Sequence, residues 1–269
     1  MSDSESTREI PGDDWDREHT SLSGQQHQGT ADSDGFFQTA ASRFEELRHR
    51  LDLVGKIIRG SPVSVRPYRP DADGHLSTFE VPDGEEEVDR YWVNAPFAYV
   101  VITYDDEASE RYYNAVEPYL DSFEQNLLAR LKTDIRAPLM YQSADESSTE
   151  EALVSELSRL LETYGIEVGM RTFYALFYYL KRDFRDFGKL DPLLNDEHIE
   201  DISCDGYELP IFVYHDDYTD IETNISFGQK ELDNFVIRLA QQSGQHISVG
   251  DPMVEATLED GSRAEMSLG

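Results

Sequence analysis

The last eighty or so of the 269 residues carry a succession of hydrophobic patterns that restricts the possible folds more than any other feature of the chain. Three short runs rich in β-branched and aromatic residues come first, the third weaker than the other two, followed by a run with the spacing of an amphipathic helix and by two alternating runs. These runs cover residues 199–204, 211–215, 219–224, 229–242, 254–258 and 264–268. Asp260-Gly261, between the last two, is typical of a hairpin turn. Residues 191–269 are therefore expected to form a small antiparallel sheet with a helix.

The chain before residue 191 shows both periodicities. Helices are expected at residues 37–58, 120–135, 148–165 and 168–187, and short strands at residues 79–81, 91–93, 99–104 and 112–116. The Phe and Tyr residues of the last helix recur at helical spacing, which is typical of a packed core rather than a cofactor site. The expected fold is α+β, with an α+β subdomain at 36–145, a helical pair at 146–190 and the sheet-plus-helix domain at 191–269.

Residues 1–35 consist mostly of Ser, Asp, Glu, Gln and Gly. Such a composition buries too little apolar surface to offset the entropy of ordering, so a disordered acidic tail is expected. The first residues lack the basic and apolar segments of a signal peptide. No apolar stretch approaches the roughly 20 residues of a spanning helix. The expected location is cytoplasmic, with any attachment to the cell membrane made through a partner.

The net charge of −32 is extreme, with 55 acidic against 23 basic residues. One interpretation is a protein that binds cations or basic partners, and the other is a protein of a salt-rich cytoplasm. At molar salt the screening length is only about 3 Å, which suppresses repulsion between carboxylates. The acidic residues are spread along the whole chain, which favours the halophilic interpretation. Nucleic-acid binding is not expected, because it needs a basic face.

The chain contains no Gly-x-x-x-x-Gly-Lys-Ser/Thr motif. That loop cradles phosphates with backbone amides, and its Ser/Thr hydroxyl binds Mg²⁺. Lys56 and Lys189 follow glycines, but Ile57 and Leu190 come next. A C-terminal P-loop domain is therefore absent from the sequence, and this chain alone is expected neither to bind ATP and Mg²⁺ nor to hydrolyse ATP.

Histidine and cysteine give weaker signals. His198-Ile199-Glu200 and His215-Asp216-Asp217 place potential metal ligands close together, but without helical ligand spacing. Surface or turn positions are the favoured interpretation over a zinc site, so no metal site is expected. The single cysteine, Cys204, excludes an internal disulfide, and its strand-like surroundings predict a small buried residue.

The order of short motifs from Asp191 to Gly269 resembles the N-terminal domain of the type II/IV secretion ATPases, the hexameric motors of archaella and type IV pili. The motifs that carry the resemblance are Asp191-Pro192-Leu193-Leu194, Thr223-Asn224, Arg238-Leu239-Ala240 and Asp260-Gly261-Ser262-Arg263. A weaker similarity, at residues 88–101, is to the archaeal and particularly the haloarchaeal branch of that family.

The resemblance implies a motor in which nucleotide lies between an N-terminal and a C-terminal domain. ATP and Mg²⁺ would be its cofactors, and a membrane platform protein its partner. The resemblance also implies that Arg263, and less directly Arg238, contacts the nucleotide phosphates. Arg263 could equally form an ion pair with Glu255 or Glu265, and Arg238 could be solvated or pair with Asn234.

Two interpretations of the whole chain stay open, beside a weaker third in which the chain is an acidic adaptor that uses its disordered tail. The first is the N-terminal portion of a motor that assembles a pilus, archaellum or related filament by ATP hydrolysis, present here as a partial sequence. The second is an inactive truncated module that binds the platform protein or intact ATPase subunits. Under the first interpretation the intact protein is expected to be a hexamer.

Overall fold

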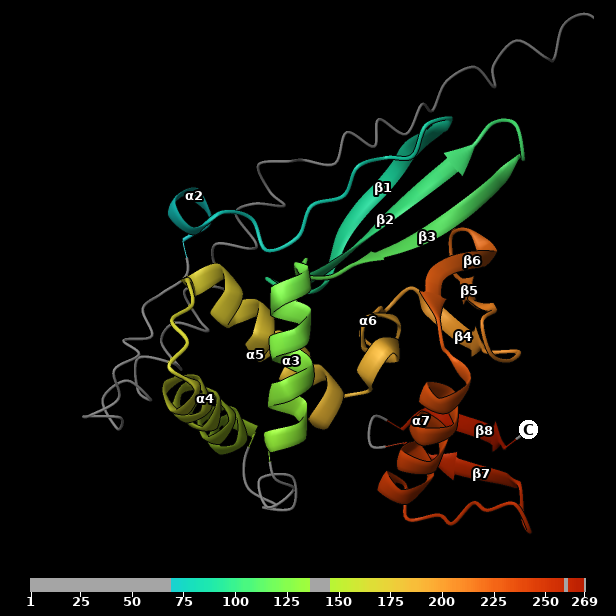
Figure 1. The fold of residues 1–269 in the computed structure, drawn as a ribbon. Coiled ribbons are helices and arrows are strands. Elements are labelled where there is room, and N and C mark those ends of the chain that lie inside the picture. The colour runs from blue at the N-terminus through green and yellow to red at the C-terminus, as the bar shows by residue number, and fades with distance from the viewer. Residues whose placement is uncertain (1–68, 136–145, 259–260, 269) are drawn as a thin grey trace, which may run out of the picture. The chain divides into compact units, whose positions relative to one another are not determined.

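The computed structural model describes residues 69–135, 146–258 and 261–268 (Figure 1). The acidic tail predicted at 1–35 and the helix predicted at 37–58 lie outside these residues. The first helix among the described residues is the short α2 (Pro70–Asp73). None of the helices in the described part of the chain combines the length and apolar composition of a membrane-spanning segment.

A six-stranded sheet is built from two antiparallel meanders. The strand order is β1-β2-β3-β6-β5-β4, so the last strand of each meander lies at the centre. The strands are β1 (Glu85–Asn94), β2 (Ala98–Asp105), β3 (Glu110–Val116), β4 (Ile199–Ser203), β5 (Pro210–His215) and β6 (Thr219–Ser226). The sheet thus contains strands from both sides of residue 191.

The seam between the meanders is a short parallel pairing of β3 with β6. It joins Tyr112 to Glu222 and Tyr113 to Thr223. Beyond these two residue pairs, the side chain of Asn224 makes the hydrogen bonds between the two strands. Its amide oxygen accepts from the Ala115 N–H at 2.9 Å, and its amide nitrogen donates to the Ala115 carbonyl at 3.0 Å. Asn224 therefore extends a pairing that the backbones alone make over only two residue pairs.

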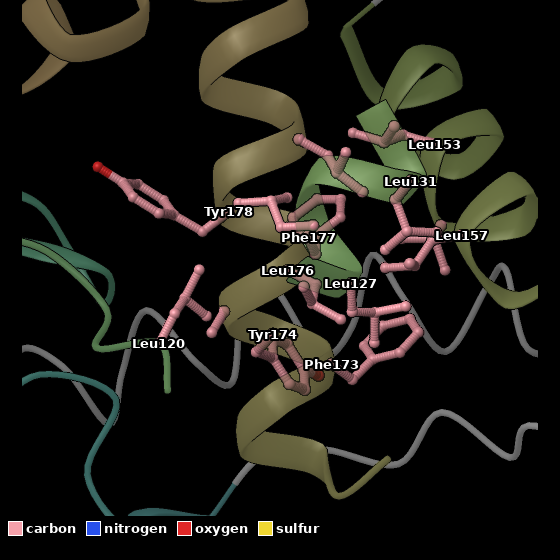
Figure 2. Close-up of a cluster of buried hydrophobic side chains, with 14 of the residues drawn as sticks. Leu120, Leu127, Leu131, Leu153, Leu157, Phe173, Tyr174, Leu176, Phe177 and Tyr178 are labelled. Carbon is pink, nitrogen blue, oxygen red and sulfur yellow. The ribbon is translucent and has the colours of Figure 1, made fainter. Parts of the chain in front are cut away.

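Three helices surround a leucine-rich and aromatic core: α3 (Ser122–Asp134), α4 (Glu146–Tyr164) and α5 (Met170–Phe184). We call these three helices the helical layer. Figure 2 shows Phe173 and Phe177 of α5 directed at leucines of α3 and α4, while Tyr178 points to the opposite side. There the Tyr178 ring stacks on Phe97, with centroids 5.3 Å apart. Because α5 is covered on both sides, its central run at residues 173–180 is apolar all round, while charged residues lie near its ends.

The second core joins the sheet to the C-terminal elements. It contains inward residues of β2, β3, β5 and β6 together with residues of α7 (Gln229–Gln242), β7 (Met253–Thr257) and β8 (Arg263–Ser267). Between the helical layer and β4 lie a 3₁₀ turn, η2 (Gly188–Leu190), and the short helix α6 (Asp191–Leu194). α7 begins and ends at the predicted residues, and Gly244 follows it with φ +72°, as a helix stop requires.

The α+β prediction is confirmed, and so are most of the predicted elements within the described residues. The strand predicted at 79–81 is wrong: the structure has no regular element there, and β1 starts only at Glu85. The run at 219–224, predicted as a weak strand, is a full strand of eight residues at the centre of the sheet. Its polar residues belong there because Asn224 and buried Thr223 form the seam.

Candidate functional site

The candidate site is the hairpin that carries Arg263. β7 and β8 pair antiparallel, with Thr257 opposite Arg263. The strands alternate, so Met266 faces the core while Arg263 and Glu265 are exposed. Gly261 has φ +92°, which explains why a glycine occupies this turn position. The hairpin therefore presents the Arg263 side chain to solvent at the first residue of β8.

Arg263 makes no ion pair among the described residues, including with Glu255 or Glu265. Glu255 lies directly opposite Glu265, and Glu265 is two residues from Arg263 on the same face of the hairpin. Like charges directly opposite one another on a sheet are destabilising. The exposed face of the hairpin thus combines two facing carboxylates with a guanidinium that neither of them holds.

Arg263 also lies at a groove lined by side chains of β4, α7, β7 and β8, with a volume of about 1250 Å³. Phe235 and Leu232 are among the apolar side chains that line it. Among the described residues that line it, Arg263 is the one lysine or arginine, whereas Glu200, Asp201 and Glu255 are acidic. A polyphosphate in this groove would meet mostly carboxylates, so any bound nucleotide needs further cations from outside it.

Arg238 lies in a different environment. Its guanidinium donates to the backbone carbonyl of Asp183 at the end of α5 and lies over the Phe235 ring, 5.6 Å from the centroid. A Cβ at Gly188 would come within 2.9 Å of its Nη2, so glycine leaves space for the arginine. Burial lowers the pKa of Arg238. Arg238 is therefore partly buried and bonds to Asp183 rather than to Asn234, so its side chain joins α7 to the helical layer.

The two histidine motifs meet in space. Backbone pairing sets Ile199 opposite His215, and the rings of His198 and His215 stack with centroids 5.3 Å apart. The prediction of surface or turn positions is wrong for His215, which is 1% exposed at the end of β5. The sequence contained the signal, because His215 continues the alternation of buried Ile211 and Val213.

The prediction for Cys204 is also wrong, since the thiol is exposed. β4 ends at Ser203, so Cys204 has no inward position on the pleated strand. Burial of part of the residue nevertheless raises the pKa of the thiol. An exposed thiol with a raised pKa is a poor nucleophile, so Cys204 adds no chemistry to the site.

Comparison with known proteins agrees with the upstream part of the resemblance. Residues 45–119 match the family model described as PilB3-like, N-terminal. This range includes residues 88–101, where the motifs resemble those of the archaeal branch. The coarse assignment to secretion-ATPase-like N-terminal domains therefore has support independent of the hairpin motifs.

Relatives occur in the archaeon Methanocaldococcus jannaschii. The uncharacterized protein MJ1288 is 33% identical over 175 residues, which cover 64% of this chain and 69% of the relative. The uncharacterized protein MJ0781 is 29% identical over 155 residues, and this alignment spans only 21% of that longer relative. The chain belongs to the family of MJ1288, and its residues 45–119 are similar to PilB3-like N-terminal domains.

Proposed function

We propose that the chain is the N-terminal part of a type II/IV secretion ATPase and that Arg263 contacts the phosphates of the bound nucleotide. The observation that carries the proposal is the exposed Arg263 guanidinium, which no ion pair holds among the described residues. In the intact motor, ATP hydrolysis would power the assembly of a pilus, an archaellum or a related filament. ATP and Mg²⁺ are its cofactors under this proposal.

The chemistry of guanidinium suits this role. Its forked donors match phosphate oxygens, and its charge is permanent. An arginine that reaches the transferred phosphoryl group contributes 10³–10⁵ in rate in well-studied NTPases. The acidic groove around Arg263 does not attract polyphosphate by itself, so the nucleotide must be held by a P-loop domain. Arg263 then approaches an already bound nucleotide across the boundary between domains.

Arg238 is the weaker candidate for such a contact. To reach a nucleotide, its guanidinium would have to leave the Asp183 carbonyl and the Phe235 ring. In the observed conformation it fixes α7, which packs against the hairpin through the second core. Its proposed contribution is therefore to hold the arginine-bearing hairpin in position.

The test is the ATPase rate of the intact motor, meaning this region together with the P-loop domain that the proposal requires, measured in molar salt. Arg263→Ala should lower the rate by about 10³-fold, while the midpoint of chemical unfolding stays unchanged. Glu265→Ala is the matched control, because it removes a charge from the same exposed face of β8. An Arg263→Ala motor that hydrolyses ATP at the normal rate would show that Arg263 plays no catalytic part.

The alternative is an inactive module that binds the membrane platform protein or intact ATPase subunits. Phe212 and Tyr214 support it, because they are 39% and 41% exposed on the outer face of β5. Phe212→Ser would then weaken co-purification with intact subunits or the platform protein, and Arg263→Ala would leave it unchanged. If instead Arg263→Ala weakens co-purification and Phe212→Ser leaves it unchanged, the motor is favoured.

The remaining expectations belong to the same proposal. The intact motor would be a hexamer at the cytoplasmic side of the membrane, attached through its platform protein. The spread of acidic residues supports a salt-rich cytoplasm. Circular dichroism during removal of salt checks this point: cooperative structure should be lost at low salt, and an unchanged spectrum would contradict it.

A further inference from the structure

The stacked histidines form part of a three-residue cluster that the proposed function does not use. His198, His215 and Asp216 each offer one metal-binding atom, and these atoms all lie within 4.8 Å of one another. The Asp216 carboxylate oxygens lie 3.2 Å from Nδ1 of His198 and 3.2 Å from Nδ1 of His215. Tetrahedral zinc sites with bonds of 2.0–2.1 Å place neighbouring ligand atoms about 3.4 Å apart. The contacts that Asp216 makes with the two rings already have nearly this spacing.

The backbone brings these ligands together. Ile199 pairs with His215 across β4 and β5, and the Asp216 N–H donates to the His198 carbonyl at 2.9 Å. His198 immediately precedes β4, while Asp216 immediately follows β5. His198 and Asp216 therefore lie next to the ends of two hydrogen-bonded strands. Only short side-chain movements are needed to bring their ligand atoms to a metal ion. Rigid elements of this kind hold metal ligands more accurately than free loops.

A chain of buried hydrogen bonds orients the His215 ring through its Nε2 atom. The Tyr91 hydroxyl donates to Asp196 at 2.8 Å and lies 3.0 Å from Nε2 of His215. Because that hydroxyl proton is already directed at Asp196, His215 must donate its Nε2–H to Tyr91. The Asp217 N–H donates to Nδ1 of His215, which is consistent with the same tautomer.

Asp196 completes this second layer. It is 6% exposed and also accepts from the Tyr113 hydroxyl at 2.7 Å and the His198 N–H at 3.0 Å. In many proteins, a metal-ligating histidine donates a hydrogen bond to a carboxylate from the ring nitrogen that does not bind the metal. This bond fixes the tautomer and the orientation of the ring. Here the path runs through the Tyr91 hydroxyl, and it leaves the Nδ1 lone pair of His215 on the side of Asp216 and His198.

We propose that His198, His215 and Asp216 bind a divalent transition-metal ion of the zinc class through two Nδ1 atoms and one carboxylate. Imidazole with a carboxylate suits Zn²⁺, Co²⁺ and Ni²⁺ better than Mg²⁺ or Ca²⁺, which take oxygen ligands. Three protein ligands leave a fourth position for water or for a group from a partner. The side chains of His198 and Asp216 are 46% and 45% exposed, so the ion can enter from solvent.

Binding has two structural consequences. The ligand atoms that are farthest apart must approach by up to about 1.4 Å, and His198, which is exposed, is the residue that can move. The Asp217 N–H must also give up its hydrogen bond to Nδ1 of His215, because one lone pair cannot serve both. The metal would then clamp the edge strand β4 to β5, at the end of the sheet farthest from β1.

The experiment is a titration of the full chain with Zn²⁺ and Co²⁺ in molar KCl with excess Mg²⁺, which occupies non-specific carboxylates. We expect one equivalent to bind, with Co²⁺ giving visible absorption bands of mixed nitrogen and oxygen ligation. His198→Ala and Asp216→Asn should weaken binding at least about 100-fold, and Tyr91→Phe about 10-fold. In amide NMR spectra, the Asp217 signal should shift on addition of Zn²⁺.

Exposed His246 provides the matched control, since His246→Ala removes an imidazole away from the cluster. Its affinity for Zn²⁺ should equal that of the unaltered chain. His198→Ala and Asp216→Asn change exposed side chains, so far-ultraviolet circular dichroism should confirm that both variants fold. The proposal is overturned if His198→Ala keeps the full affinity, if His246→Ala loses it, or if Zn²⁺ binds no more tightly than Mg²⁺. None of these measurements depends on ATP hydrolysis, so they are separable from the proposed function.

Discussion

The helical layer and the terminal hairpin use basic residues in opposite ways. In the helical layer, Arg171 and Arg182 are bound to acidic partners inside the protein. Arg171 donates to Glu124 at 2.8 Å, and Arg182 donates to both carboxylate oxygens of Glu117 at 2.7 Å. In the hairpin, Arg263 is exposed, and no ion pair holds it among the described residues.

The contrast is informative because basic residues are scarce. The chain has 23 of them against 55 acidic residues, so an arginine meets potential partners almost everywhere. Arg182, with a side chain only 8% exposed, satisfies carboxylates that burial would otherwise destabilise. Arg263 is the one lysine or arginine after residue 242, and it has no such structural duty. An arginine that the fold does not need is the better candidate for contact with a ligand.

The largest effect is expected at Arg182. Arg182→Ala leaves Glu117 and Asp183 without their guanidinium, and breaking a buried ion pair in this way costs about 3–5 kcal/mol. Chemical unfolding in molar salt measures the loss. Arg159→Ala is the control, since Arg159 forms an exposed pair with Glu156 within α4 and should leave the unfolding midpoint unchanged. Equal effects at the two positions would remove the distinction between internal and surface pairs.

Asp191 is a buried acidic residue, and its titration shows whether buried charge near the helical layer always stabilises the fold. Burial, and then repulsion from Asp186, raises its pKa from 3.8 to about 6. The folded chain therefore binds a proton more readily than the unfolded chain between about pH 4 and pH 6. The free energy of unfolding should fall by up to about 3 kcal/mol as pH rises through that window, and then stay constant.

Asp191→Asn should abolish this dependence. At pH 8 the variant is expected to be more stable by about 1–3 kcal/mol, because the carboxylate is no longer buried with its charge. Below about pH 4 the gain should vanish, since both states of Asp191 are then protonated. Unfolding curves at pH 4, 6 and 8 measure the effect, and a gain that persists at pH 4 would point to a cause other than ionisation.

An intermediate effect is expected at Arg238, which joins the two regions. Arg238→Ala removes a hydrogen bond to the Asp183 carbonyl and a contact with the Phe235 ring. The loss should be about 1–2 kcal/mol. Lys230→Ala, on the exposed side of α7, is the matched control. If Arg238→Ala is as stable as the control, the joining role is wrong and a direct contact with nucleotide becomes the better interpretation.

The smallest effect on stability is expected at Arg263. Arg263→Ala should change the free energy of unfolding by less than about 0.5 kcal/mol, as is usual for exposed positions without special contacts. Thermal unfolding in molar salt checks this value. A larger loss would mean that Arg263 stabilises the hairpin, and the comparison between the two regions would then fail.

Much of the local structure could be predicted because its causes are local. The helical spacing of residues 229–242 and the alternation in β7 and β8 depend only on which face is buried. The aromatic residues of α5 were predicted to form a core, and they do. The strand at 219–226 was underestimated, because Asn224 is polar for a reason that lies in β3, more than 100 residues away in the sequence.

The sequence alone determined the α+β class, the main helices, the hairpin and the exposed position of Arg263, because periodicity and turn residues act over a few positions. Tertiary structure decided which distant groups meet. It joined two meanders through Asn224, directed Arg238 to the end of α5 and stacked His215 on His198. The physical reason is that such contacts depend on strand pairing and register between segments far apart in the chain, and no local pattern in either segment encodes the identity of its partner.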